Sequence, residues 1–344
     1  MLSRLAAALL SVVAVCAAGC SGGDDDEPEL GEAGGGTIAF ARSKPPMDIG
    51  LLDISGGEPT LITRGDEHDT LVPSRGLDWS PDGELLAFIG SARNPAGGER
   101  LSDIYLMRPD GSDVRPVTSV GDAASPTWST DGESIVFSRL ESGDAPPIGN
   151  LWLVNIATGE VRQLTDNPSG VVDLFASVSP VNDLVAFGRV RYDEDNASGT
   201  LNIDLGIYTL DLGGGEPTLL IDDAVRPRFS PDGAMLAYAS TADENGISYG
   251  EPETIATELY VANADGSNPR RLTQTFAVDE SLATWVGRER LVFQRGVENG
   301  YGSSLLEINV DGTCEREVLN DPTGETSFGS PSWRPSESPP PIAC

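Results

Sequence analysis

The sequence predicts an all-β protein, a six-bladed β-propeller of four-stranded blades. Two observations carry this prediction. Similar stretches recur about every 50 residues, a period typical of propeller blades. No helical periodicity of apolar residues follows the first twenty residues. The 40 glycines and 25 prolines suit the many tight turns of such a fold.

Each repeat has one aromatic or apolar residue at a fixed place, called here the Trp position. In the segment GLDWSPDGELLAF (76–88) it is Trp79, and a second aromatic residue, Phe88, follows nine residues later. Successive Trp positions are 49, 50, 51, 56 and 48 residues apart. After Trp79 they are Trp128, Val178, Phe229, Trp285 and Trp333.

The residues between these positions predict four short strands per repeat. The first strand holds the Trp position and ends in a turn such as Pro81-Asp82-Gly83. The second strand is apolar on both faces, as in SIVFS (134–138), because it packs between neighbouring blades. The third strand is the stretch ELYVA (258–262) in one repeat, with equivalents in the others. The fourth strand alternates polar and apolar residues, as in VRQLT (161–165), which suits an outer edge of the sheet.

The two ends of the repeat region predict how the ring closes. The chain enters at a strand of the second type, residues 37–41, and leaves at a strand of the first type, residues 330–333. We therefore expect the C-terminal strand to complete the N-terminal blade. The predicted propeller covers residues 37–336, and a Pro-rich tail covers residues 337–344.

The segments WSPDGELLAF…DIYLMRPDGSDVRPVT and FSPDGAMLAY…ELYVANADGSNPRRLT resemble TolB-type propeller repeats. The resemblance covers residues 37–336 and implies the same fold. TolB proteins are soluble periplasmic partners in an envelope complex and carry an additional N-terminal domain, where we expect only a tether in this chain, so the resemblance does not carry their partners over. Related repeats precede the hydrolase domain of prolyl oligopeptidase-like enzymes, but we expect no such domain after these repeats and no G-x-S-x-G nucleophile elbow.

The first 19 residues predict a lipoprotein signal peptide. Arg4 precedes an eleven-residue apolar stretch (5–15), which is too short to span a bilayer. The sequence Ala17-Ala18-Gly19-Cys20 is similar to a bacterial lipobox, so Cys20 is the predicted lipidation site. Residues 20–36 then form an acidic, Gly-rich tether. The alternative is ordinary cleavage after Ala17, which leaves Cys20 free.

Export places the remaining cysteines in an oxidising compartment. Cys16 leaves with the signal peptide, so Cys314 and Cys344 remain. They are predicted to form a disulfide that latches the ring on the face opposite the long loops, with two free thiols as the alternative. Closing a loop of about 30 residues contributes on the order of 3–4 kcal/mol in the chain-entropy model.

The charge composition excludes some functions. The chain has 22 Lys and Arg against 54 Asp and Glu, a formal net charge of -32. Nucleic-acid binding needs a basic footprint, so we expect no nucleic-acid partner. The single histidine, His68, lies in a polar connection and excludes sites built from several histidines.

A calcium site in the central channel is the main catalytic alternative. Asp173, Asp223 and Glu280 each precede a first strand that lines the channel, where their oxygens could converge. However, Arg226 and Arg228 flank the same place. The run Asp193-Glu194-Asp195-Asn196 lacks the remaining ligands of a calcium loop. We therefore expect no metal or other cofactor and no catalytic residue, with Ca²⁺ as the alternative.

The predicted loops concentrate negative charge on one face. The connections at 190–206 and 241–257 are the longest, and they share this face with the connections between blades. The face is interpreted either as a docking surface for a protein or cell-envelope ligand or as a means of keeping the protein soluble. Its predicted acidic residues between blades are Asp66, Glu67, Asp69, Asp122, Asp166, Asp173, Asp222, Asp223, Asp279, Glu280, Asp321 and Glu325.

Together these features predict an extracytoplasmic, lipid-anchored propeller, in the periplasm or on the cell surface. It acts as a non-catalytic binding scaffold for a protein or cell-envelope ligand. The alternative is a Ca²⁺-dependent hydrolase or lyase with its site in the channel.

The membrane anchor can be tested at Cys20. Cys20→Ser removes the thiol that accepts the lipid, so the protein should move from the membrane fraction to the soluble fraction. Fractionation and immunoblotting of cells that express each form measure this. Continued sedimentation of the variant with membranes would contradict lipidation at Cys20.

Overall fold

The computed structural model describes residues 36–43, 47–63, 71–73, 76–92, 100–141, 147–195, 200–243, 247–248, 254–296, 302–321 and 326–335. All regular secondary structure in these ranges is β-strand. The same ranges contain no helix that is long and apolar enough to cross a membrane. The predicted signal peptide, tether and C-terminal tail lie outside the described residues, apart from Gly36 at the end of the tether.

The strands pair mainly with their neighbours in the sequence, in units of four or five. In chain order the bounds are β1 (Thr37–Arg42), β2 (Asp48–Asp53), β3 (Thr60–Leu61), β4 (Leu71–Pro73), β5 (Asp78–Trp79), β6 (Leu86–Ala92), β7 (Leu101–Met107), β8 (Arg115–Pro116), β9 (Ala123–Trp128), β10 (Ser134–Glu141), β11 (Ile148–Asn155), β12 (Val161–Gln163), β13 (Val171–Val178) and β14 (Leu184–Asp195). They continue with β15 (Thr200–Asp211), β16 (Thr218–Asp222), β17 (Ala224–Phe229), β18 (Met235–Ser240), β19 (Ile247–Ser248), β20 (Thr254–Ile255), β21 (Glu258–Asn263), β22 (Arg270–Arg271), β23 (Glu280–Val286), β24 (Arg290–Gly296), β25 (Ser303–Asn309), β26 (Arg316–Leu319) and β27 (Phe328–Trp333).

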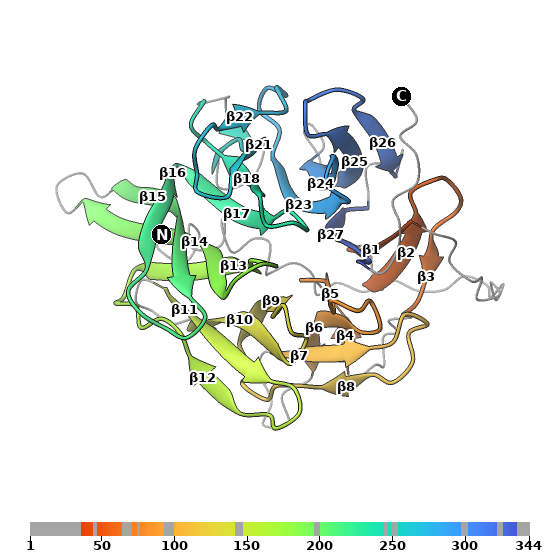
Figure 1. Ribbon diagram of the computed structural model, residues 1–344, viewed down its shortest axis with the longest axis horizontal. Coiled ribbons are helices and arrows are strands. Elements are labelled where there is room, and N and C mark those ends of the chain that lie inside the picture. The colour runs from red at the N-terminus through yellow and green to blue at the C-terminus, as the bar shows by residue number, and fades with distance from the viewer. Residues whose placement is uncertain are drawn as a thin grey trace.

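The units surround a common centre, as Figure 1 shows. The strands that carry the Trp position lie innermost and the fourth strands lie at the rim, for example β17 and β22 in the order β17-β18-β21-β22. The first unit combines both ends of the repeat region, because β27 pairs with β1 in the order β27-β1-β2-β3. One parallel bridge, between Gly149 and Val172, links two neighbouring units into an eight-stranded sheet.

The hydrophobic core lies between neighbouring units. The aromatic residue of the second strand is almost inaccessible, as at Phe137 (0% exposed). Clusters combine two units, since Ile104 and Leu106 of β7 pack with Trp128 and Phe137 of the next unit. The tryptophans at the Trp position are buried, which confirms that they belong to the hydrophobic core. Burial of such side chains contributes about 1.5–3 kcal/mol each.

Hydrogen bonds join the innermost strands of neighbouring units. At four of the Trp positions, the backbone N–H donates to the side chain of the residue before the Trp position in the preceding unit. The donor–acceptor distances are 2.9 Å from Trp128 N to Asp78 Oδ2, 3.0 Å from Phe229 N to Ser177 Oγ, 3.1 Å from Trp333 N to Thr284 Oγ1, and 3.3 Å from Trp79 N to Ser332 Oγ. The last two bonds tie β27 to the units on both of its sides.

Every innermost strand is also bulged at the same place, three residues before the Trp position. The residue there has a positive φ, a conformation that favours glycine because it has no Cβ. At Gly76 this costs little, but the other five positions carry side chains: Ser125 (φ 48°), Phe175 (56°), Arg226 (57°), Leu282 (51°) and Ser330 (51°). In the units with a continuous innermost strand, the pairing with the second strand shifts register around this residue.

The turn after the first strand is held by a serine and an aspartate. Ser80 Oγ donates to Asp82 Oδ1 (2.6 Å) and accepts the N–H of Leu85 (2.9 Å). The serine hydroxyl lowers the pKa of Asp82, because it stabilises the charged carboxylate. The pairs Ser129–Asp131 and Ser230–Asp232 repeat this arrangement.

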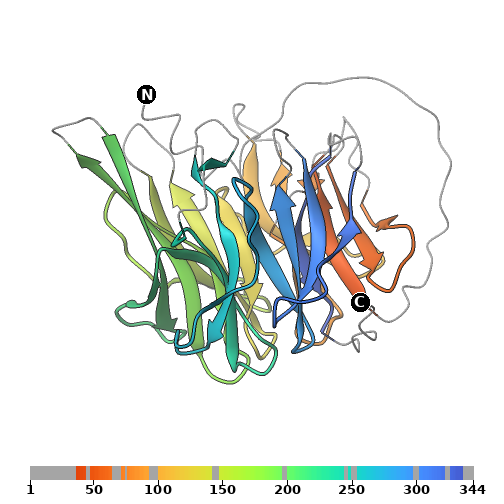
Figure 2. The ribbon, with the colours of Figure 1, turned by 90° about the horizontal axis from the view of Figure 1, so that it is seen from above.

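The long connections differ from their prediction as loops. Most of 190–206 is strand, because β14 and β15 pair residue by residue from Leu184↔Asp211 to Asp195↔Thr200. This hairpin projects beyond the neighbouring units in Figure 2. Part of 241–257 forms the two-stranded sheet of β19 and β20. Alternating apolar residues such as Leu201 and Ile203 favour strand here, a signal that the acidic residues of the segment obscure.

The predicted disulfide is only partly within the described residues. Cys314 follows the Asp311–Gly312 turn between β25 and β26, and it is disulfide-bonded. Cys344, its predicted partner, lies outside the described residues, as does Cys20. The pairing of Cys314 with Cys344 therefore stays a prediction.

Candidate functional site

The candidate site lies at one end of the ring, called here the loop face. It carries the connections between units and those between second and third strands, including the β14–β15 hairpin (upper edge of Figure 2). The opposite end, the turn face, carries the other two kinds of turn. The sequence places the predicted docking residues and the predicted calcium ligands on the loop face.

Several acidic residues predicted for docking are instead paired with arginines. Asp173 is inaccessible and receives Arg189 Nε at 2.6 Å and Nη2 at 2.8 Å. Asp122 is paired in the same way with Arg139 (2.8 Å). In both units the acid lies near the start of the first strand and the arginine lies on the second strand. Asp173 is inaccessible to a ligand, whereas Asp122 stays partly exposed.

The convergence of Asp173, Asp223 and Glu280 that the calcium alternative requires is not present among the described residues. Asp173 is held by Arg189 and by Asn167 Nδ2 (2.7 Å), whereas Asp223 is exposed. Glu280 is inaccessible and bound to Arg295. Among the described residues, no group of three His, Cys, Asp or Glu side chains is arranged to hold a metal ion. Sequence spacing places these acids at equivalent starts of strands, but arginines on the adjacent strands hold Asp173 and Glu280 apart.

Glu280 is the most perturbed carboxyl group on the loop face. Its Oε1 accepts Arg295 Nε at 2.5 Å, but its buried Oε2 has no hydrogen-bond partner. Burial raises the pKa of Glu280 to about 7, and the nearby charge of Glu258 adds to this. Glu258 is buried too, with Arg271 at 2.9 Å. A carboxyl group whose pKa is raised close to neutral pH is typical of functional sites and also of buried ion-pair networks.

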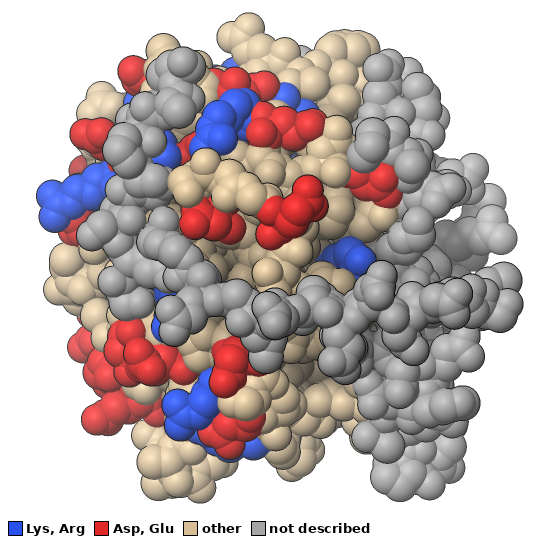
Figure 3. Space-filling model, turned by 90° about the vertical axis from the view of Figure 1, so that its right-hand side faces the viewer, with Lys and Arg blue, Asp and Glu red and all other residues tan. Residues whose placement is uncertain are grey.

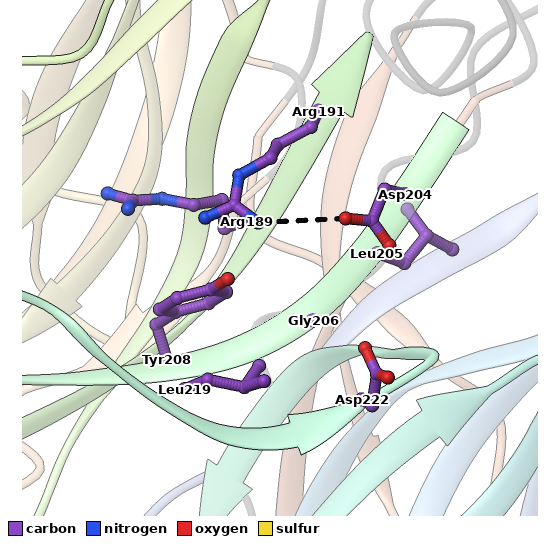
Figure 4. A pocket seen from close by; sticks show the side chains of 8 residues that line it. All are labelled: Arg189, Arg191, Asp204, Leu205, Gly206, Tyr208, Leu219 and Asp222. Atoms are coloured by element: carbon purple, nitrogen blue, oxygen red, sulfur yellow. Dashed lines mark ion pairs between the residues drawn. The ribbon is translucent and has the colours of Figure 1, made fainter. Parts of the chain in front are cut away.

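A small polar pocket lies at the base of the β14–β15 hairpin (Figure 4). Its volume is about 240 Å³, and Arg191 and Asp204 face each other across it at 3.6 Å. The guanidinium groups of Arg189 and Arg191 lie over the Tyr208 ring, 4.8 and 5.3 Å from its centroid. This pocket could not be predicted from the sequence, because its lining residues become neighbours only when β14 pairs with β15. The lining residues are Arg189, Arg191, Asp204, Leu205, Gly206, Tyr208, Leu219 and Asp222.

An ion pair joins innermost strands that are far apart in the sequence. Arg228 of β17 donates to Asp78 of β5, 150 residues away, and these strands lie on different sides of the centre in Figure 1. Asp78 also accepts the hydroxyl of Thr127 (3.1 Å) and the N–H of Trp128. Arg228, which the sequence places beside the calcium candidates, therefore has a structural partner.

Negative charge is not confined to the loop face. Figure 3 shows acidic side chains spread over the visible side of the molecule, with fewer basic ones among them. The turns need aspartate to accept hydrogen bonds, as Asp82 does from Ser80 and from the N–H of Glu84. This need places acids on the turn face, namely Asp53, Asp82, Asp110, Asp131, Asp211, Asp232, Asp265 and Asp311.

The loop face does carry one exposed aromatic residue. Phe276, between β22 and β23, is 74% exposed, more than any other large apolar side chain among the described residues. Aromatic residues are enriched where proteins bind one another. Composition alone does not distinguish Phe276 from the buried phenylalanines, so the sequence did not identify it.

Other sequence candidates lie partly or wholly outside the described residues. His68 is among these, together with Asp66, Glu67, Asp69, Asn196 and Glu325. The expectation that no G-x-S-x-G motif occurs is wrong for the sequence pattern, because Gly246-Ile247-Ser248-Tyr249-Gly250 matches it. Ser248 pairs with Thr254 in the β19–β20 hairpin, whereas an elbow requires a strand followed by a helix.

Comparison with known proteins identifies similar repeats. The chain is 31% identical over 141 residues to the Tol-Pal system protein TolB of Nitratidesulfovibrio vulgaris, covering 40% of this chain and 28% of that protein. It is 27% identical over 201 residues to an uncharacterized peptidase, YuxL, of Bacillus subtilis, covering 57% of this chain and 25% of the peptidase. The chain thus spans little more than a quarter of either relative. No protein-family profile matches it.

Among solved structures, TolB from Acinetobacter baumannii is similar, with a TM-score of 0.62 and 20% identity. The match covers 87% of this chain and 66% of that one. A likeness at this identity establishes the fold.

The raised pKa of Glu280 makes stability depend on pH. The folded chain keeps the proton up to about pH 7, whereas the unfolded chain releases it near pH 4.5. The unfolded state therefore binds fewer protons in this window, and the free energy of unfolding should fall as the pH rises from 4.5 to 7. Glu280→Gln should remove this fall, on the order of 3 kcal/mol.

Thermal unfolding between pH 4.5 and 8 measures the effect. Glu315→Gln is the matched control, because Glu315 binds the same arginine (2.7 Å) but is partly exposed. An equal slope in the Glu280→Gln variant and the wild type would contradict the raised pKa.

Proposed function

Because the chain carries a TolB-like β-propeller, we propose that it is an extracytoplasmic binding scaffold, tethered to a membrane by lipid on Cys20. It holds a protein or cell-envelope ligand on its loop face and catalyses no reaction. The proposal includes a ring of six blades in which β27 closes the first. The pairing of β27 with β1 supports closure, as do its hydrogen bonds to β5 and β23.

One observation carries the non-catalytic part of the proposal. The carboxylates at the starts of the innermost strands are the groups that a channel enzyme would use, and Asp173 and Glu280 are bound to Arg189 and Arg295. A metal would have to displace these arginines from inaccessible carboxylates. Breaking a buried ion pair costs about 3–5 kcal/mol, so the arrangement favours a structural role.

Binding is supported by the exposed features of the same face. Phe276 projects into solvent from a connection between units, and the β14–β15 hairpin stands out beside its polar pocket. An apolar anchor among polar groups is the usual composition of a protein interface. The TolB relative is named as a component of a Tol-Pal system, that is, of an assembly. An extracytoplasmic protein partner is consistent with this likeness.

A hydrolase or lyase is the second candidate, because one relative is named as a peptidase. The matched region covers only 25% of that peptidase. This candidate needs a metal or a nucleophile in the channel, and chelation distinguishes it. A large fall in melting temperature on chelation, with one metal per chain, would favour the enzyme.

Photo-crosslinking in intact cells tests the scaffold. A photoreactive phenylalanine analogue replaces Phe276 on the loop face or, as control, Val114 on the turn face, which is 46% exposed. We expect adducts of defined mass from position 276 and none from position 114. Adducts from position 114 alone, or none from either position, would refute binding through the loop face.

A further inference from the structure

Arg226 differs from the other arginines of the innermost strands and the loop face. It is the third residue of β17, close to the loop-face end of that strand. Arg228, two residues further on, is bound to Asp78, and Arg189 and Arg295 are bound to Asp173 and Glu280. Within the described part of the chain, no carboxylate lies within ion-pair distance of Arg226. An unpaired cation is unexpected in a chain with a net charge of -32.

The guanidinium group of Arg226 is partly enclosed. Its Nε is buried and has no hydrogen-bond partner. The Phe175 ring of the preceding unit covers one face of the group, with 4.9 Å between Arg226 Cζ and the ring centroid. Leaving a buried charged donor without a hydrogen-bond partner is unfavourable, because the donor has lost its water without replacing it. The fold therefore retains an unfavourable group at this position.

The surrounding charges do not compensate for this burial. Burial lowers the pKa of Arg226, and attraction to Asp279 opposes that effect at longer range. The Asp279 carboxylate is engaged elsewhere, since its Oδ1 accepts the N–H of Thr257 at 3.1 Å. The Phe175 ring of β13 lies against the guanidinium group, and Gly188 of β14 lies beside the backbone N of Arg226. None of these groups supplies an anion.

The backbone of Arg226 adds a second cost. Its φ is 57°, in the left-handed region, where a side chain is less favourable than glycine. A positive φ recurs at the equivalent position of every unit, so it belongs to the bulge, and glycine at Gly76 and serine at Ser125 and Ser330 show that the bulge does not require a large cation.

We infer that Arg226 binds a carboxylate of a ligand that enters the loop-face end of the ring, the free carboxylate of a peptide. A guanidinium group donates two parallel hydrogen bonds to a carboxylate, and stacking on Phe175 fixes its plane for this contact. A single arginine near Asp279 suits one negative charge better than the two of a phosphate. This inference rests on the proposed function, because it defines what the loop face binds.

A small probe tests the site without the natural partner. The full-length chain carrying Cys20→Ser is titrated with N-acetyl-Ala-Ala, with its C-terminal amide, and with inorganic phosphate. The Nε–H signal of Arg226 is followed by NMR, together with the melting temperature. We expect the free acid alone to shift this signal in a saturable way and to raise the melting temperature.

Substitution adds a readout that a structural arginine would not give. Arg226→Met removes an unsatisfied cation, so the melting temperature without ligand should rise, on the order of 2–4 °C, while the response to the free acid disappears. Arg162→Met is the control, because Arg162 is exposed and donates to the carbonyl groups of Leu212 and Gly213. This variant should keep the response.

Three results would overturn the inference. They are an equal response to the free acid and the amide, a response to phosphate without one to the free acid, and a fall in the melting temperature of Arg226→Met. The probe experiment is independent of partner capture. Failure of crosslinking at position 276 with an intact probe response would refute the scaffold and leave the carboxylate site in place.

Discussion

The structure depends on hydrogen bonds between innermost strands of neighbouring units. At four of the Trp positions the backbone N–H is held by a side chain of the preceding unit, as Trp128 is by Asp78 and Trp79 by Ser332. Each such bond contributes only about 1 kcal/mol, but it fixes the angle at which the next sheet packs. The buried aromatic residues of the second strands then fit between sheets that are already aligned.

The same packing explains why acidic residues of the loop face are paired with arginines. An acid near the start of the first strand pairs with an arginine of the second strand, as in Asp173–Arg189, Glu280–Arg295 and Asp122–Arg139. Among the described residues, Arg226 has no such partner and Phe276 is exposed, so these two residues, rather than the acids, distinguish the face.

The sequence predicts the fold because the repeat places glycine, proline and apolar residues at regular spacing, and each of these acts locally. The Trp position and the Pro-Asp-Gly turn are examples. The candidate site is harder to predict, because the pairing between strands determines which charged residues become neighbours. The sequence offers Asp173 and Glu280 as candidate ligands only in the calcium alternative, and it does not show their arginine partners, which lie 16 and 15 residues further along the chain. The sequence of 190–206 predicts a loop because the acids obscure the alternation of its apolar residues.

Native-state hydrogen exchange tests most directly whether the inner strands form one closed ring. The account predicts that the backbone amides of Trp79, Trp128, Phe229 and Trp333 exchange at the same slow rate, through global unfolding only, because each is held by the neighbouring unit. Faster exchange at Trp79 and Trp333 than at Trp128 and Phe229 would contradict it. That result would mean that β27 opens by itself and that the ring is not closed by the inner hydrogen bonds.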